Sequence, residues 1–434
     1  MIIKNKNLYH KLLFVASLLL LLFPAAQISG PFLTDFFLIL IGIIFLFVHN
    51  YNHKFILFKN RFFLVFTIFY ISLIIGSLLS ENIMLSLKSS VFYIRFLFFS
   101  LAIFFIFRNN KNYLKYFYII LFCTLIILVF DGYYQFFTGK NIFGFAKIRP
   151  DRLGGLFFEE LILGSYVSKI LPIFFTFVII NKDLFNKKYI LLFSVLSYVL
   201  IFLSGDRAAF FLFSLFLILI APFFLSLKSS LVVALSAFIF FSVLILSNKN
   251  LKSRYVDQML IHTIKKNSES TIKKNSESTI FMPDHIGLFT GAIDIFKKNI
   301  LFGSGVKTFR VECIYTEQNA YTIILKEEIP NISFCSTHPH NYYLQLLAET
   351  GLIGFFFIFI FFLKLCFDYC KQIRRRYLNK KINKAYICIL VGMIQAIWPL
   401  TTTGSFFNNW TCSTIFLTVG VYLFVFSNEV KNKL

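Results

Sequence analysis

Polar side chains with chemical potential gather in one segment, "CSTHPHNYYLQLLAETGLIGFFF", which covers residues 335–357 and runs directly into a long apolar stretch. Proline suits the first turn of a helix, so Pro339 predicts a helix start with His340 and Asn341 in that turn. The positive end of the helix dipole favours a neutral imidazole, which can accept a proton, and it also favours a nearby anion. His340 is therefore a candidate general base for an alcohol beside an anionic group. An isolated histidine is more often a structural or interfacial residue than a catalytic one.

Arginines occur in the polar segments that we expect on the same side of a membrane. Arg152 ends "RPDR", Arg207 ends the tight turn "SGDR", and Arg254 and Arg310 lie in the long polar region 248–351. Guanidinium groups bind phosphate through two parallel hydrogen bonds and keep their charge, so several outward arginines suit a diphosphate. The alternative for each one is snorkelling to lipid headgroups or pairing with a neighbouring aspartate.

Membrane-spanning helices must position these residues, because 58% of the 434 residues are hydrophobic and only 15% are charged. Apolar runs of about 17–20 residues alternate with short polar stretches, and such runs predict helices that cross a bilayer. The sequence thus predicts an all-α polytopic membrane protein, with Gly351 ending or bending the helix of His340 before a span begins. Twelve spans are expected, near residues 12–29, 32–48, 62–79, 91–107, 114–131, 162–180, 189–204, 207–225, 230–247, 352–368, 385–400 and 411–427.

The net charge of +23 does not indicate nucleic-acid binding, because the basic residues lie in short connections rather than on one soluble module. They recur in nearly every second connection, whereas the connection 401–410 carries no charge. Cytoplasmic connections are enriched in Lys and Arg, so this alternation predicts that both termini are cytoplasmic. Three regions follow: residues 1–247 with nine spans, a large outer loop at 248–351, and residues 352–434 with three spans.

The outer loop is far longer than any other connection, and loops of this length are usually functional or disordered. The stretch 283–299, "PDHIGLFTGAIDIFKKN", has apolar residues at helical spacing and predicts an amphipathic helix at the outer membrane face. The polar octapeptide "TIKKNSES" occurs at 263–270 and again at 271–278, and we expect no catalytic role for it. We expect neither a metal nor a cofactor, since no paired acidic motif or phosphate-binding glycine loop is present.

The segment "HNYYLQLLAETGLIG" resembles the signature of the O-antigen ligase and polymerase superfamily. That signature is His, then Asn, Ser or Gln, nine further residues, Gly, two residues, and Gly, Thr or Tyr. His340, Asn341, Gly351 and Gly354 satisfy it, and Glu349 also fits the usual pattern.

Three further segments carry the same resemblance in the same order along the chain. "LSGDRAAFF" is similar to the family's Ser-Gly-x-Arg turn and contains Arg207, and "RPDRLGGLFFEE" is similar to an Arg-x-x-Gly element formed by Arg152 and Gly155. "FKKNILFGSGVKTF" resembles the segment that precedes the histidine, except that Asn299 stands where a proline is usual. His338 does not align with the motif and is expected to be secondary.

The resemblance implies transfer of a glycan from undecaprenyl diphosphate to an acceptor hydroxyl at the periplasmic face of the bacterial inner membrane. Members are similar in needing no metal and no nucleotide sugar. His340 would activate the acceptor, and Arg207 and Arg152 would hold the diphosphate as it leaves. The chain is most like O-antigen ligase, whose acceptor is lipid A–core. The expected supporting residues are Asn341, Glu349, His338, Arg310 and Arg254.

Other functions stay open at this point. An O-antigen polymerase and a protein O-oligosaccharyltransferase share the motif, although the late position of the large loop favours a ligase. A lipid-linked oligosaccharide flippase is the non-enzymatic alternative, but flippases tend to show internal repeats, and no predicted span repeats another. Cys313 and Cys335 both lie in the outer loop, so a disulfide between them in the oxidising periplasm is a further hypothesis.

Overall fold

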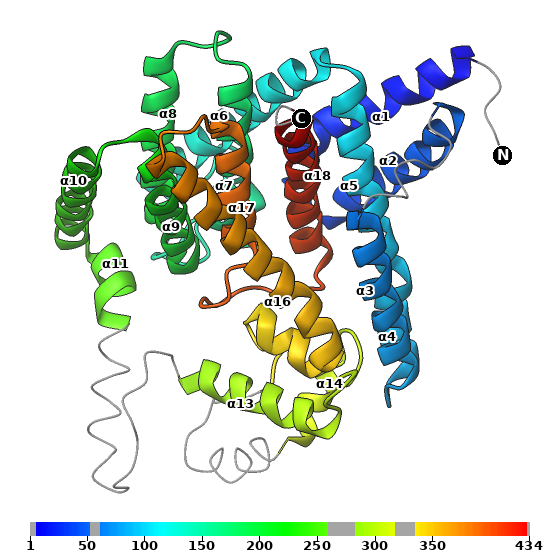
Figure 1. Cartoon of the computed structure of the whole chain (residues 1–434). Helices are drawn as coiled ribbons and strands as arrows, with labels where there is room; N and C mark the ends of the chain where they lie inside the picture. The colour runs from blue at the N-terminus through cyan, green and yellow to red at the C-terminus, as the bar shows by residue number, and fades with distance from the viewer. Residues whose placement is uncertain (1–5, 53–60, 259–282, 317–334, 432–434) are drawn as a thin grey trace, which may run out of the picture.

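The architecture is all-α, and the computed structural model describes residues 6–52, 61–258, 283–316 and 335–431 (Figure 1). The repeated "TIKKNSES" lies outside the described residues. Short 3-10 or π-helical turns occur at η2 (Val91–Tyr93), η3 (Gly155–Phe157), η4 (Ser253–Asp257) and η5 (Cys313–Tyr315). The helices are α1 (Lys6–Ala26), α2 (Pro31–Asn52), α3 (Arg61–Leu78), α4 (Ile83–Ser90), α5 (Ile94–Asn109), α6 (Asn112–Thr138), α7 (Leu163–Ile180), α8 (Lys187–Leu203), α9 (Arg207–Phe224), α10 (Leu227–Ser247), α11 (Lys249–Lys252), α13 (Pro283–Lys298), α14 (Phe309–Glu312), α16 (Tyr342–Tyr377), α17 (Lys384–Ala396) and α18 (Asn409–Lys431).

Ten spans of the described chain are long and apolar enough to cross a membrane, which makes this a polytopic membrane protein. The twelve predicted spans all fall on helices, but those at 189–204 and 385–400 fall on α8 and α17, which have only 17 and 13 residues. At 1.5 Å per residue, α17 is about 20 Å long, whereas the hydrocarbon core of a bilayer is roughly 30 Å thick. By length and composition, ten helices of the described chain therefore qualify as membrane spans, and α8 and α17 fall short of that length.

The core of the bundle consists of α5, α7, α17 and α18. Helix α18 packs along α5, and α17 packs along α7, while α10 at the edge of the bundle is almost entirely exposed. The last turns of α18 lie at the opposite end of the molecule from α13 and α14 (Figure 1). The helices of the long outer loop thus gather at one end of the bundle.

Helix α16 extends from the outer loop into the bundle and is kinked. Gly351 has φ 61° and ψ −164°, a conformation outside the helical region, so the predicted bend at this glycine is confirmed. The predicted helix start is wrong, because the helix begins at Tyr342 and Asn341 is its N-cap. Pro339 and His340 precede the helix. The φ of +55° at His340 is incompatible with a right-handed helix, which explains the later start.

The segment 300–305, which contains "FGSG", closes the backbone gap that the kink opens in α16. The Leu352 N–H donates to the Ile300 carbonyl at 2.8 Å, on the spanning side of the kink. On the other side, the Ser304 N–H donates to the Ala348 carbonyl at 2.9 Å. Backbone groups that a kink would leave unpaired are thereby satisfied, as buried polar groups require.

Helix α13 forms as the 283–299 pattern predicts, and it packs against α16. Its buried residues Leu288, Ala292 and Ile295 form a small outer cluster with side chains of α14 and α16. Cys313 belongs to this cluster and is bonded to Cys335, with 5.3 Å between their Cα atoms. The cluster fixes the outer part of α16, and with it the segment that carries the histidines.

Candidate functional site

The connection between α6 and α7 (residues 139–162), here called the first outer segment, meets the "SGDR" turn through its backbone. The Leu153 N–H donates to the Ser204 carbonyl at 3.1 Å. Gly205 has φ +70°, and a side chain here would collide with the carbonyl of Asp151, so only glycine permits this approach. The contact places Arg152 beside the start of α9, where Arg207 is the first helical residue.

Arg254 joins this pair from η4. Its Nε–H donates to the Gly205 carbonyl at 2.8 Å, and its guanidinium lies 3.9 Å from Asp151. Arg207 donates to the Arg254 carbonyl at 3.5 Å, and Arg152 lies 4.0 Å from Asp206. Three segments that are distant in sequence therefore converge into one arginine group, formed by Arg149, Arg152, Arg207 and Arg254.

The arginine group carries more positive charge than its neighbours neutralise. Four guanidinium groups face two carboxylates, those of Asp151 and Asp206. Burial, followed by repulsion from Arg207 and Arg152, lowers the pKa of Arg254 to about 10, so it still remains charged at neutral pH. A cavity of about 170 Å³ opens beside Asp151 and Arg152. Such a surplus of buried positive charge next to a cavity suits an anionic ligand.

Lys147 also lines this cavity, and the sequence analysis did not single it out. Its ammonium donates to the Phe136 carbonyl at 3.0 Å, and burial lowers its pKa. No local spacing distinguishes Lys147 from other loop lysines. Only the fold reveals that it adds a cation to the arginine side of the site.

His340 is held by the loop that joins α17 to α18. The Thr403 N–H donates to the His340 carbonyl at 2.8 Å. Asn341 caps α16 by accepting from the N–H groups of Tyr343 and Leu344, while its amide donates to the Pro399 carbonyl at 2.8 Å. The asparagine of the motif thus joins the helix start to the opposite loop and fixes the backbone that carries His340.

Three histidine rings gather at this point. The His338 and His340 ring centroids are 4.2 Å apart, and His285 of α13 lies 5.4 Å from His340. Burial lowers the pKa of His340, and burial together with His340 lowers the pKa of His338 to about 4. Both rings are therefore neutral at physiological pH, as a general base requires. The cause is burial rather than the helix dipole that the sequence suggested.

Arg310 lies with the histidines and not with the arginine group. It interacts electrostatically with His338 and Glu349, and its side chain is exposed. The sequence placed Arg310 and Arg254 in the same supporting class, but the structure separates them. His285 was missed, because nothing in its spacing relates it to a motif 55 positions further along the chain.

Glu349 is a buried organiser of the outer loop. Its carboxylate accepts from the N–H groups of Lys307 at 2.9 Å and Phe309 at 3.2 Å. It also accepts from the Gln345 amide at 3.0 Å. These bonds connect the segment after "FGSG" to α16. The arrangement supports a positioning role for Glu349.

In the described part of the chain, no group of three or more His, Cys, Asp or Glu side chains has an arrangement able to hold a metal ion. The two clusters offer different chemistry: a surplus of guanidinium charge in one and neutral imidazole in the other. Together they match the needs of a reaction in which an alcohol loses a proton and an anion departs.

Comparison with known proteins identifies one family and no individual relative. Residues 192–359 match the family model described as O-Antigen ligase. No curated protein matches the chain. The matched segment runs from α8 into α16 and includes Arg207, Arg254 and His340, whereas Arg152 precedes it. Residues 192–359 therefore carry the O-antigen ligase domain, and enzymes of this family transfer lipid-linked glycans.

Proposed function

We propose that this protein is an O-antigen ligase that transfers a glycan from undecaprenyl diphosphate to a hydroxyl of lipid A–core. The observation that carries the proposal is the presence of two chemically distinct clusters within one family fold. A charged arginine group suits the donor diphosphate, and the neutral His340 suits the acceptor hydroxyl.

In the proposed reaction, the His340 imidazole takes the proton of the acceptor hydroxyl. The acceptor oxygen forms a bond to the anomeric carbon of the donor glycan. The bond from that carbon to the phosphate oxygen breaks, and its electron pair leaves with undecaprenyl diphosphate. Arg152, Arg207 and Arg254 stabilise the charge that develops on this leaving group, and charge fixed in advance favours the transition state.

Asn341, Glu349 and His338 are supporting residues in this proposal. Asn341 and Glu349 hold the backbone around the base through the bonds described above. His338 packs against His340 and restricts its ring orientation. Arg310 supplies positive charge on the acceptor side.

We also propose that all twelve predicted spans cross the inner membrane, with both termini cytoplasmic and the site periplasmic. Ser165, at the start of α7, donates to Asp206 before α9 at 2.7 Å, so α8 has to return across the full length of α7. The bond from Asn341 to Pro399 similarly implies that α17 and the residues after it return to the level of the α16 start. We likewise propose the three predicted regions: nine spans in residues 1–247, the large outer loop in 248–351, and three spans in 352–434.

A deletion strain complemented with the wild-type gene or a His340→Ala variant tests the function, with lipopolysaccharide separated on gels. A ligase predicts that deletion removes long chains from lipid A–core while lipid-linked polymer accumulates, and that only the wild-type gene restores them. A core that bears a single repeat unit would instead identify a polymerase. Unchanged lipopolysaccharide together with loss of a glycoprotein would identify a protein O-oligosaccharyltransferase.

A further inference from the structure

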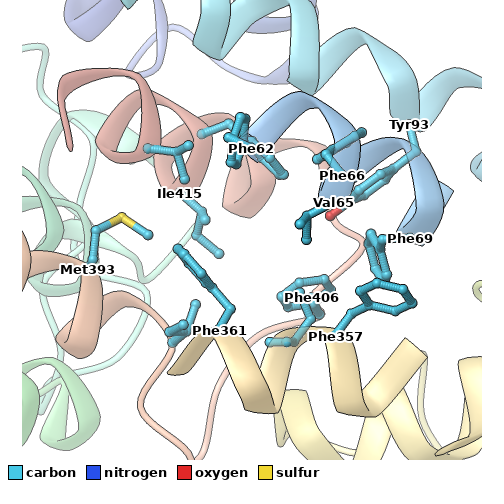
Figure 2. A pocket seen from close by; sticks show the side chains of 14 residues that line it. Phe62, Val65, Phe66, Phe69, Tyr93, Phe357, Phe361, Met393, Phe406 and Ile415 are labelled. Atoms are coloured by element: carbon cyan, nitrogen blue, oxygen red, sulfur yellow. The ribbon is translucent and has the colours of Figure 1, made fainter. Parts of the chain in front are cut away.

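An apolar cavity lies within the bundle on the histidine side. Its walls come from α3, α16, α17, α18 and η2, and its volume is about 90 Å³. Figure 2 shows the rings of Phe66, Phe69, Phe357 and Phe361 around this space. Val65 is 48% exposed, so the cavity opens at the surface of the bundle.

A pair of cations that is separate from the arginine group, Arg95 and Lys307, lies next to this cavity. The Arg95 guanidinium lies over the ring of Phe96, 4.9 Å from its centroid. Phe96 in turn contacts Tyr93 and Phe416, which line the cavity. Asp35 lies 3.6 Å from Arg95 and also interacts electrostatically with Lys307.

This pair has unused binding capacity. The Nε atom of Arg95 is buried and has no hydrogen-bond partner among the described residues. Lys307 also lies close enough to Arg310 and Arg95 to be repelled by both. Arg95, Lys307 and Arg310 together face the carboxylates of Asp35 and Glu349, which leaves an excess of positive charge.

The cavity and the cation pair are connected to the proposed base. The ring centroids of Phe406, in the cavity wall, and Tyr342 are 5.5 Å apart. The backbone N–H of Phe406 donates to the side-chain carbonyl of Gln345 at 2.7 Å. Gln345 donates to Glu349, which accepts from the Lys307 backbone. One hydrogen-bonded chain therefore runs from the apolar wall to the backbone of Lys307, beside the segment that holds His340.

We propose that this cavity and the Arg95–Lys307 pair form a binding site for a lipid acceptor, with its acyl chains in the cavity and its phosphate on the cations. This inference rests on the proposed function, because it assigns the acceptor to the side of the base. The arginine group that suits the donor is built from other elements: the first outer segment, α9 and η4. An apolar pocket next to surplus positive charge is complementary to an anionic amphiphile.

The test measures binding of lipid A and of undecaprenyl diphosphate to the purified full-length protein in detergent. Lys307→Gln removes one charge from the site, and Val65→Trp fills the mouth of the cavity at a half-exposed position. Each change should weaken lipid A binding about tenfold and leave undecaprenyl diphosphate binding within about twofold. The matched controls are Lys298→Gln, exposed in the same outer region, and Ile71→Trp, a half-exposed α3 position outside the cavity; both should bind like wild type.

Three results would overturn the inference. Unchanged lipid A binding by both variants would show that no such site exists. Equal weakening of both ligands would assign the cavity to the donor. Displacement of lipid A by an equal concentration of phosphatidylglycerol would show a site for ordinary bilayer lipid. These measurements involve no glycan transfer, so an inactive wild-type protein with the expected binding pattern would reject the proposed function and support the inference.

Discussion

Replacement of Arg207 by lysine tests whether the arginine group binds the leaving diphosphate. In the protein, the Arg207 guanidinium makes one long hydrogen bond, to the Arg254 carbonyl at 3.5 Å. Loss of that bond costs no more than about 1 kcal/mol of folding stability. Lysine keeps the positive charge but lacks the planar fork that binds two phosphate oxygens at once.

The expected effect on catalysis is larger than the effect on folding. A hydrogen bond to a charged group contributes about 1.5–3 kcal/mol, and the bidentate geometry supplies at least one bond that lysine cannot replace. At about 1.4 kcal/mol per tenfold change in rate, Arg207→Lys should lower kcat/KM roughly 10- to 150-fold. Most of the loss should appear in kcat, because the charge develops in the transition state.

The assay is transfer of a lipid-linked glycan by purified protein, with thermal unfolding measured in parallel. Arg149→Lys is the matched control, since Arg149 belongs to the same group but is half exposed and pairs with Asp151 through its Nε and Nη2 atoms. The control should keep activity within about threefold, because exposed ion pairs contribute little. Near-normal turnover by Arg207→Lys, or an equal loss in both variants, would refute the assignment of Arg207 to the diphosphate.

Three further predictions concern the histidine side and its support. Because burial lowers the pKa of His340, its imidazole stays neutral below the ordinary value of about 6.5, so kcat/KM should fall only at more acidic pH; an acidic limb centred at or above 6.5 would contradict this. Glu349→Ala leaves the Lys307 N–H without its acceptor and should lower unfolding stability by about 1–3 kcal/mol, with a smaller loss for Glu349→Gln; equal melting temperatures would argue against the organising role. Cys313→Ser opens a bridge between residues 22 positions apart and should cost about 3 kcal/mol, so an unchanged melting temperature, or free thiols at Cys313 and Cys335 in unreduced wild type, would argue against the bridge.

The sequence was sufficient where a property depends on neighbouring residues. Every predicted span falls on a helix, so hydropathy located these helices correctly. Gly351 predicted the kink, because the outer part of α16 and its spanning part are separated only by the non-helical backbone of this glycine. The count of ten against twelve arises at α8 and α17, which have only 17 and 13 residues; at α17 the apolar run continues to residue 400, beyond the last helical residue. A run of apolar residues indicates that a segment lies in an apolar environment, but it does not indicate how many of those residues are helical.

Properties that depend on distant segments were not predictable from spacing. Arg254 lies 47 positions after Arg207, and its place in the arginine group follows from a bond to Gly205 that no local pattern specifies. His285 reaches His340 only because α13 packs on α16. The position of His340 before the helix depends equally on Thr403 of another loop. In each case tertiary packing decides the geometry, and a single sequence does not record it.

Reconstituted glycan transfer by a His340→Ala variant is the most direct test of the account. Purified wild-type and variant proteins would receive an undecaprenyl diphosphate-linked glycan and lipid A–core, and binding of undecaprenyl diphosphate would be measured separately. A general base contributes about 10²- to 10⁴-fold, so the variant should lose transfer by that factor while it binds the donor as wild type does. A variant that transfers glycan at a near wild-type rate would contradict the role of His340 as the base.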